Sequence, residues 1–128
     1  MFKPKSVFNG FSVDDLDKAK VFYTKILGLK VEDATGGASI LLPGGHKAWM
    51  YTREDHQPAT YTMLNFVVDD IDEAVDEITN RGVSFEHYEG SPQDEKGIMR
   101  GKEHHMGPNI AWFKDSAGNI LSVLEATE

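Results

Sequence analysis

Apolar and polar residues alternate along two short stretches of the chain, and each stretch runs into a pair of aspartates. The first stretch, FSVDDLDKA, starts at Phe11, and the second, FVVDDIDEA, starts 55 residues later at Phe66. Alternation with a period of two predicts a β-strand with one buried face. After each aspartate pair the apolar spacing changes to that of an amphipathic helix. A near-repeat at about half the chain length indicates an internal duplication.

The aspartate pairs are expected to cap the two helices. A carboxylate accepts hydrogen bonds from the first free N–H groups of a helix, and its charge suits the positive end of the helix dipole. Each helix is then expected to end at a glycine, which adopts the left-handed conformation at least cost. The predicted helices span 15–27 and 70–80, and the terminal glycines are Gly28 and Gly82. Capping accounts for the acidic pairs, so they are not interpreted as catalytic dyads.

Eight short segments bounded by turn residues predict strands. They span 4–13, 29–34, 38–42, 47–53, 61–68, 83–89, 109–114 and 120–125. The pattern therefore predicts an α+β protein made of two βαβββ modules. Module one covers about 1–54, a linker covers 55–60, and module two covers about 61–128. The polar stretch 90–107 is long for a loop, and loops of that length are uncommon without a function or disorder.

Charge and composition narrow the classes of partner. The formal net charge is −8, which argues against nucleic acid or an anionic membrane surface because phosphate neutralisation needs clustered Lys and Arg. The absence of cysteine excludes disulfides, thiolate metal sites and thiol nucleophiles. No apolar stretch resembles a signal peptide or reaches the ~20 residues of a membrane span. The expected location is therefore cytoplasmic.

Three features together resemble the vicinal oxygen chelate superfamily, the group of glyoxalase I, the extradiol dioxygenases, the fosfomycin-resistance enzymes and the bleomycin-resistance proteins. They are the paired βαβββ modules, the helix end FYTKILGL from Phe22, and the final segment FKDSAGNILSVLE from Phe113. The resemblance covers essentially the whole chain. It implies one domain, 1–128, in which two modules form a cupped mixed sheet. It also implies a small-molecule site in the cup between the modules.

The resemblance also identifies four positions at which the metal-using members carry ligands, one on the first strand and one on the last strand of each module. In this sequence they hold Phe8, Trp49, Met63 and Ser122. Phenyl and indole rings offer no suitable donor, a thioether is soft and neutral, and a neutral hydroxyl is weak. We therefore expect no bound metal and no cofactor.

Strand alternation assigns residues to the two faces of each predicted sheet. Phe11, Val13 and their counterparts in the second half are expected to face the helices. The opposite face is expected to line the cup with apolar and aromatic groups and a few polar ones, as in small-molecule pockets. The candidate ligand-binding residues are Phe8, Trp49, Tyr51, Met63, Asn65 and Ser122. The same residues could instead fill the cup as core, and the sequence leaves both readings open.

The long polar loop supplies a second group of candidates. Glu103, His104 and His105, with His87 on the predicted strand before them, could form an acid–base pair or an unorthodox metal site, since histidine titrates near neutrality. A solvated loop accounts for the same residues, because neighbours on an extended chain point opposite ways. Arg100, His104 and His105 are also candidates for a lid over the cup.

Three functions are compatible with these observations. The leading hypothesis is a metal-free protein of the glyoxalase and bleomycin-resistance type that binds a small, partly aromatic molecule. The second is an enzyme of the same superfamily, a lyase or isomerase that works through Glu103, His104 or His105 or through an unorthodox divalent metal. The third is a structural or regulatory protein with a filled cup. A homodimer is expected from the resemblance and from open sheet edges that need cover.

Overall fold

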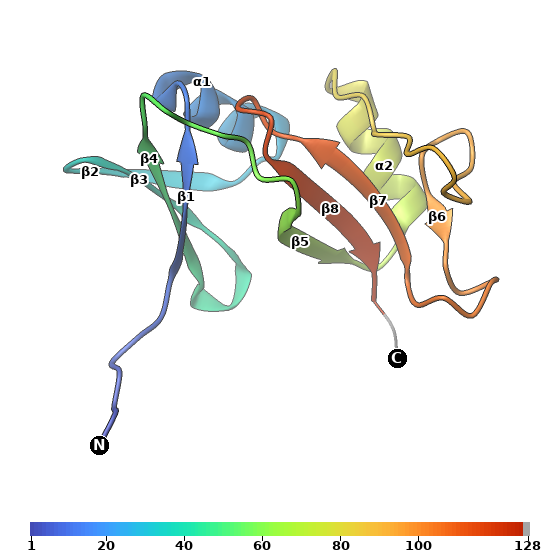
Figure 1. Cartoon of the computed structure of the whole chain (residues 1–128), viewed down its shortest axis with the longest axis horizontal. Coiled ribbons are helices and arrows are strands. Elements are labelled where there is room, and N and C mark those ends of the chain that lie inside the picture. Colours follow the sequence, from blue (N-terminus) through green and yellow to red (C-terminus); the bar gives the residue numbers. More distant parts are fainter. Residues whose placement is uncertain (127–128) are drawn as a thin grey trace. The chain divides into compact units, whose positions relative to one another are not determined.

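The computed structural model describes residues 1–126 and contains two compact units, residues 1–58 and a second unit that begins at Ala59. Each unit holds a four-stranded mixed sheet with an α-helix packed against one face (Figure 1). Within the described residues, no helix has the length and the apolar character needed to cross a membrane.

The first unit is built in the order strand, helix, three strands. Its elements are β1 (Asn9–Val13), α1 (Leu16–Val21), a π-helical turn (Phe22–Ile26), β2 (Lys30–Ala34), β3 (Gly37–Leu41), a 3₁₀ turn (Pro43–Gly45) and β4 (Lys47–Thr52). The strand order in the sheet is β1-β4-β3-β2. Strand β1 runs parallel to β4, and the other pairs are antiparallel.

The second unit repeats this topology. Its elements are β5 (Thr62–Val68), α2 (Ile71–Asn80), β6 (Met99–Arg100), β7 (Asn109–Lys114) and β8 (Ile120–Glu125). The strand order β5-β8-β7-β6 is equivalent to that of the first unit. The register is equivalent too, because Phe11 pairs with Met50 and the corresponding Phe66 pairs with Val123. The predicted α+β fold of two βαβββ modules is therefore confirmed.

Both helices begin as the sequence predicts. The carboxylate of Asp15 accepts the N–H of Lys18, and that of Asp70 accepts the N–H of Glu73, each at 3.1 Å. The first helix becomes π-helical after Val21. The N–H of Leu27, for example, donates to the carbonyl oxygen of Phe22, five residues earlier. A threonine hydroxyl within this turn bonds back to a main-chain carbonyl, a contact that bends helices.

Two predicted strands differ from the observed ones. The strand predicted over 4–13 forms only from Asn9. Asn9 pairs with Ala48, and the neighbouring strand β4 itself begins at Lys47, so the residues before Asn9 have no strand to pair with in this sheet. The prediction of a strand over 83–89 is wrong. In that segment the backbone N–H of Glu86 donates one hydrogen bond to the carbonyl oxygen of Trp112 on β7. The short strand β6 pairs with β7 nearer the start of β7, at Asn109 and Ile110. The apolar alternation reflects burial of Phe85 against Phe113 rather than strand pairing.

Alternate residues of each sheet make the core with its helix. In the first unit the buried residues on this side are Phe11, Val13, Ala38, Ile40, Ala48 and Met50, with Ala19 and Tyr23 from the helical segment. In the second unit they are Ala111, Phe113, Leu121 and Val123, with Ile71 and Val75 of α2. We call the opposite side of each sheet, which faces away from that unit's own helix, the helix-free face.

Candidate functional site

The helix-free face of the first unit carries Trp49 and Tyr51 on β4. Gly10 of β1 lies beside Trp49 in the sheet. A methyl group at Gly10 would lie 3.6 Å from Cδ1 of Trp49, and one at Gly37 would lie 2.8 Å from its Cζ2. A methyl group at Gly37 would also overlap the carbonyl oxygen of Met50. The two glycines therefore leave room for the indole ring beside the neighbouring strands.

A polar pair lies on the same face, beside Tyr51. Ser12, the register partner of Tyr51, has its Oγ 2.7 Å from Nδ1 of His56, and both residues are half-buried. Sequence reasoning missed this pair, because His56 lies in the predicted linker, 44 residues from Ser12. The available signal was the alternation of Ser12 with the buried Phe11 and Val13, which places the serine on the helix-free face.

The helix-free face of the second unit also combines a serine with aromatic rings. Ser122 is fully buried, and its hydroxyl donates to Oδ1 of the exposed Asn65 at 2.6 Å. Trp112 is the register partner of Ser122 on β7. The ring of Tyr88 packs edge-on against Trp112, at 5.6 Å and 71°. Burial, with a smaller contribution from the charge of Glu86, raises the pKa of the Tyr88 hydroxyl.

Sequence reasoning did not assign Trp112 or Tyr88 to a site. The alternation of Trp112 with the buried Ala111 and Phe113 was a signal for the tryptophan. The residues around Tyr88 gave no such signal, because their segment does not form a regular strand and meets β7 through a single backbone hydrogen bond.

The other two predicted binding residues lie at irregular positions. Phe8 precedes β1 and is 64% exposed. Met63 is half-buried and sits where the pairing of β5 with β8 shifts register, between Thr62 and Leu64. Trp49 and Ser122 occupy equivalent places in the two units, since their register partners are Gly10 and Asn65.

These residues do not fit a divalent metal. Phe8 and Trp49 offer only rings, and the hydroxyl of Ser122 is already engaged with Asn65. Elsewhere in residues 1–126, no group of three or more His, Asp or Glu side chains is arranged to hold a metal ion. These four positions therefore offer stacking, hydrogen bonding and exclusion of water rather than metal ligation.

We expect purified protein to contain much less than one divalent metal ion per chain, because the four positions at which the resemblance implies metal ligands hold Phe8, Trp49, Met63 and Ser122. Elemental analysis after dialysis, with and without prior incubation in zinc, nickel, manganese and iron salts, measures this directly. A full equivalent of any of these metals that survives dialysis would contradict the expectation and direct attention to the histidines of the second unit.

Arg100, one of the candidate lid residues, points to the helix side of its sheet. Its guanidinium bonds the carboxylate of Asp72 on α2 at 2.8 and 3.0 Å and that of Asp94 at 3.1 Å. Lys96 pairs with Asp72 as well, at 3.4 Å. This ion-pair network fastens β6 and the segment before it to α2. The remaining loop candidates are exposed in the turns after β6, namely Glu103, His104 and His105.

The Arg100 guanidinium lowers the pKa of Asp72 to about 2, although partial burial acts in the opposite direction. A carboxylate whose pKa falls on folding stabilises the protein above its unfolded pKa and loses this effect as the pH drops through the folded value. We expect Asp72→Asn to cost about 1 kcal/mol of unfolding free energy at pH 6, a value discounted because Asp72 is half-exposed. The cost should shrink as the pH falls from about 4 to about 2.

Urea unfolding of wild type and Asp72→Asn at pH 6 and pH 2.5 measures this difference. Asp69→Asn, which removes an exposed carboxylate just before α2, is the matched control. An equal cost of Asp72→Asn at both pH values would show that the network does not act through the charge of Asp72.

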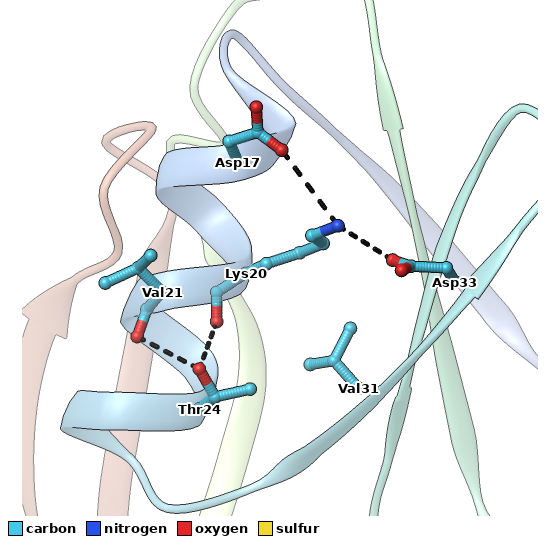
Figure 2. Close-up of a pocket in the computed structure, with 6 residues that line it drawn as sticks. All are labelled: Asp17, Lys20, Val21, Thr24, Val31 and Asp33. Atoms are coloured by element: carbon cyan, nitrogen blue, oxygen red, sulfur yellow. Dashed lines mark hydrogen bonds and ion pairs between the residues drawn. The ribbon is translucent and has the colours of Figure 1, made fainter.

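A surface hollow of about 340 Å³ lies in the first unit, between the helical segment 16–26 and β2 (Figure 2). Its polar groups satisfy one another. Lys20 bridges Asp33 at 2.8 Å and Asp17 at 4.0 Å, and the hydroxyl of Thr24 donates to the carbonyl oxygen of Lys20 at 2.7 Å. Figure 2 shows the Lys20 ammonium between the two carboxylates. This hollow is therefore a weaker candidate for ligand binding than the helix-free faces.

Comparison with known proteins agrees with this architecture. The family model described as Glyoxalase/Bleomycin resistance protein/Dioxygenase superfamily matches residues 8–123. A member of the same superfamily from Sphaerobacter thermophilus is 25% identical, with a TM-score of 0.71 over 96% of this chain and 98% of that chain. No curated protein matches the chain significantly.

Two solved structures share the fold at lower identity. TnmS3, an antibiotic binding protein from Streptomyces sp. CB03234, is 19% identical, with a TM-score of 0.66 over 98% of this chain and all of its own. The fosfomycin resistance protein FosX from Mesorhizobium loti is 15% identical, with a TM-score of 0.64 over 99% of this chain and 95% of its own. The family model covers nearly the whole chain, and the chain therefore belongs to the glyoxalase/bleomycin resistance protein/dioxygenase superfamily.

Proposed function

We propose that this protein binds a small, partly aromatic molecule against the helix-free faces of its sheets, without a metal. The observation that carries the proposal is that each face combines aromatic rings with a hydrogen-bonded serine. These are Trp49 and Tyr51 with Ser12–His56 in the first unit, where Tyr51 is the register partner of Ser12, and Trp112 with Ser122–Asn65 in the second. Aromatic surface with a few fixed polar groups is the usual make-up of small-molecule sites.

Trp49 is the proposed main anchor for the ligand. Its ring is half-buried, so part of its surface remains available for stacking. Tyr51 extends the aromatic surface two residues further along β4. On the helix-free face of the second unit, Asn65, held by the hydroxyl of Ser122, would orient polar groups of a ligand through hydrogen bonds, and Met63 would add a wall that adapts to irregular shapes. The fold likeness to an antibiotic binding protein, TnmS3, is compatible with this proposal.

A second candidate function is acid–base catalysis on the same ligand, by a lyase or isomerase. The observation in its favour is the Ser12–His56 pair, which brings an imidazole and a hydroxyl together on the helix-free face at 2.7 Å. The loop residues Glu103, His104 and His105 lie exposed in the turns after β6 and provide less defined geometry.

A screen of planar aromatic compounds by melting temperature and tryptophan fluorescence tests the proposal. Mass spectrometry of each hit after incubation with the protein separates binding from turnover. Hits that raise the melting temperature and emerge unchanged support binding alone. Hits that are converted, with conversion lost in His56→Gln, support the second candidate. A screen without hits or turnover would contradict both and favour a structural or regulatory role.

A further inference from the structure

Strand register brings three side chains of the second unit into one row on its helix-free face. Asn65 of β5 pairs with Ser122 of β8, and Ser122 pairs with Trp112 of β7. These three strands lie side by side in the sheet (Figure 1). The row therefore leads from an amide, through a hydroxyl, to an indole ring. Neighbouring strands lie about 4.8 Å apart, so the row is about 10 Å long.

The hydrogen bond between Ser122 and Asn65 fixes the direction in which the amide faces. Ser122 is fully buried, and its 2.6 Å contact with Oδ1 of Asn65 is the one hydrogen bond that its side chain makes among the described residues. With the amide nitrogen turned toward Ser122 instead, the buried hydroxyl hydrogen would have no acceptor, which is the costly way to leave a donor. The serine therefore donates, and the amide oxygen of Asn65 accepts.

The nitrogen of the Asn65 amide is thereby directed away from Ser122. Among the described residues, no acceptor lies within hydrogen-bond distance of this Nδ2, and Asn65 is exposed. An amide nitrogen carries two N–H donors and accepts nothing. The part of the amide that is available to a ligand therefore consists of donors in a fixed orientation.

The other end of the row is an aromatic surface. Trp112 is half-buried, and the ring of Tyr88 packs edge-on against it at 5.6 Å. A flat fused-ring ligand that stacks on this surface can extend along the row and bring one substituent to the amide of Asn65. That substituent has to accept a hydrogen bond, because the amide nitrogen only donates.

We propose that the second unit selects planar aromatic ligands whose ring system carries a carbonyl oxygen, and that Nδ2 of Asn65 donates to this oxygen. This inference rests on the proposed binding function and adds the class of ligand to it. Ser122 is a positioning residue, since it acts by holding the amide with its nitrogen outward. A ring of the same shape without the oxygen would cover the N–H groups of Asn65 and leave them unpaired, and would therefore bind less tightly.

Two ligands of equal shape test the inference, a fluorenone and the corresponding fluorene, each with the same short ammonium side chain for solubility. Calorimetric titration of wild type should give about tenfold tighter binding of the fluorenone. Ser122→Ala lets the amide rotate and should reduce this preference to less than about threefold. Asn65→Asp places a carboxylate oxygen opposite the carbonyl oxygen and should reverse the preference. Asn80→Asp, the same substitution at the exposed last residue of α2, is the matched control and should keep it.

The side-chain amide signals in the nuclear magnetic resonance spectrum of ¹⁵N-labelled protein give a second measurement. The Asn65 signals, assigned by their loss in Asn65→Asp, should shift with the fluorenone and much less with the fluorene. An unshifted pair of signals would show that the ligand does not reach Asn65 and would overturn the inference. Lower stability of Ser122→Ala without a change in preference would overturn the positioning role of the serine.

Failure of this inference and failure of the proposed function give different results. If wild type binds both ligands equally, or binds neither while other aromatic compounds bind, the inference is wrong and the proposed function stands. A preference that Asn65→Asp leaves in place has the same meaning. If neither ligand binds and the aromatic screen gives no hits, the proposed function and the inference are both wrong.

Discussion

Trp49→Ala is expected to weaken the binding of planar aromatic ligands by about 2 kcal/mol or more, which corresponds to roughly 30-fold in Kd. The indole of Trp49 packs against Gly10 and Gly37 of the two neighbouring strands. A ring confined by its neighbours loses little freedom when a ligand stacks on it. Offset or edge-to-face aromatic contacts contribute roughly 0.5–1.5 kcal/mol beyond area burial.

Calorimetric titration of a ligand hit into wild type and Trp49→Ala measures this loss. Phe22→Ala is the matched control, because it removes a half-buried aromatic ring that packs on Tyr23, on the helix side of the first unit. The control should lower stability and leave ligand affinity unchanged. If Trp49 is only core, Trp49→Ala will instead lower stability by about 3–5 kcal/mol and retain binding, which would contradict its role as an anchor.

Asp115→Ala is expected to lower the unfolding free energy by about 3 kcal/mol, through the turn between β7 and β8. Asp115 is 6% exposed. Its Oδ1 accepts the N–H groups of Ala117 and Asn119, each at 2.9 Å, and its Oδ2 accepts the side-chain amide of Asn119 at 3.2 Å. Removing the carboxylate leaves these donors buried without their acceptor, which is the costly way to lose a hydrogen bond.

The loss should extend beyond the turn itself. Oδ1 of Asn119 accepts the N–H of Ala59 at 3.0 Å, so the hairpin also holds the segment that leads into β5. Urea unfolding followed by circular dichroism measures the effect. Asp115→Asn keeps one oxygen acceptor and should cost less, about 1 kcal/mol. Ser116→Ala, at the exposed neighbouring position, should be nearly neutral. A change below about 0.5 kcal/mol for Asp115→Ala would contradict this account of the turn.

Local patterns in the residue order were sufficient to predict an α+β fold of two βαβββ modules. The repeated alternation before each aspartate pair, the caps Asp15 and Asp70, and the glycines at the helix ends are all signals contained within one element. The same alternation predicts that Trp49 and Ser122 lie opposite the helix-packed residues, as their register shows. Such signals work because they depend on burial of one face and on backbone conformation, both of which neighbouring residues specify.

Alternation does not identify the hydrogen-bond partners of a segment, and the folded chain was needed for these. The segment 83–89 has the apolar spacing of a strand, yet Phe85 is buried by packing on Phe113 while β6 takes the place beside β7. The orientation of the Arg100 side chain could not be predicted from alternation either. Its guanidinium points toward Asp72, 28 residues earlier, and a charged residue in a polar loop carries no local signal for that contact.

The polar pairs of the candidate site depend most on the folded structure. Ser12 meets His56 across 44 residues, and Ser122 meets Asn65 across 57. A hydrogen bond forms only when strand order and register bring both partners within about 3 Å. Neither partner's neighbours in the sequence specify that distance. The chain's residue pattern thus identifies the strands and the face on which each serine lies, and the parallel pairing of β5 with β8 brings Ser122 to Asn65.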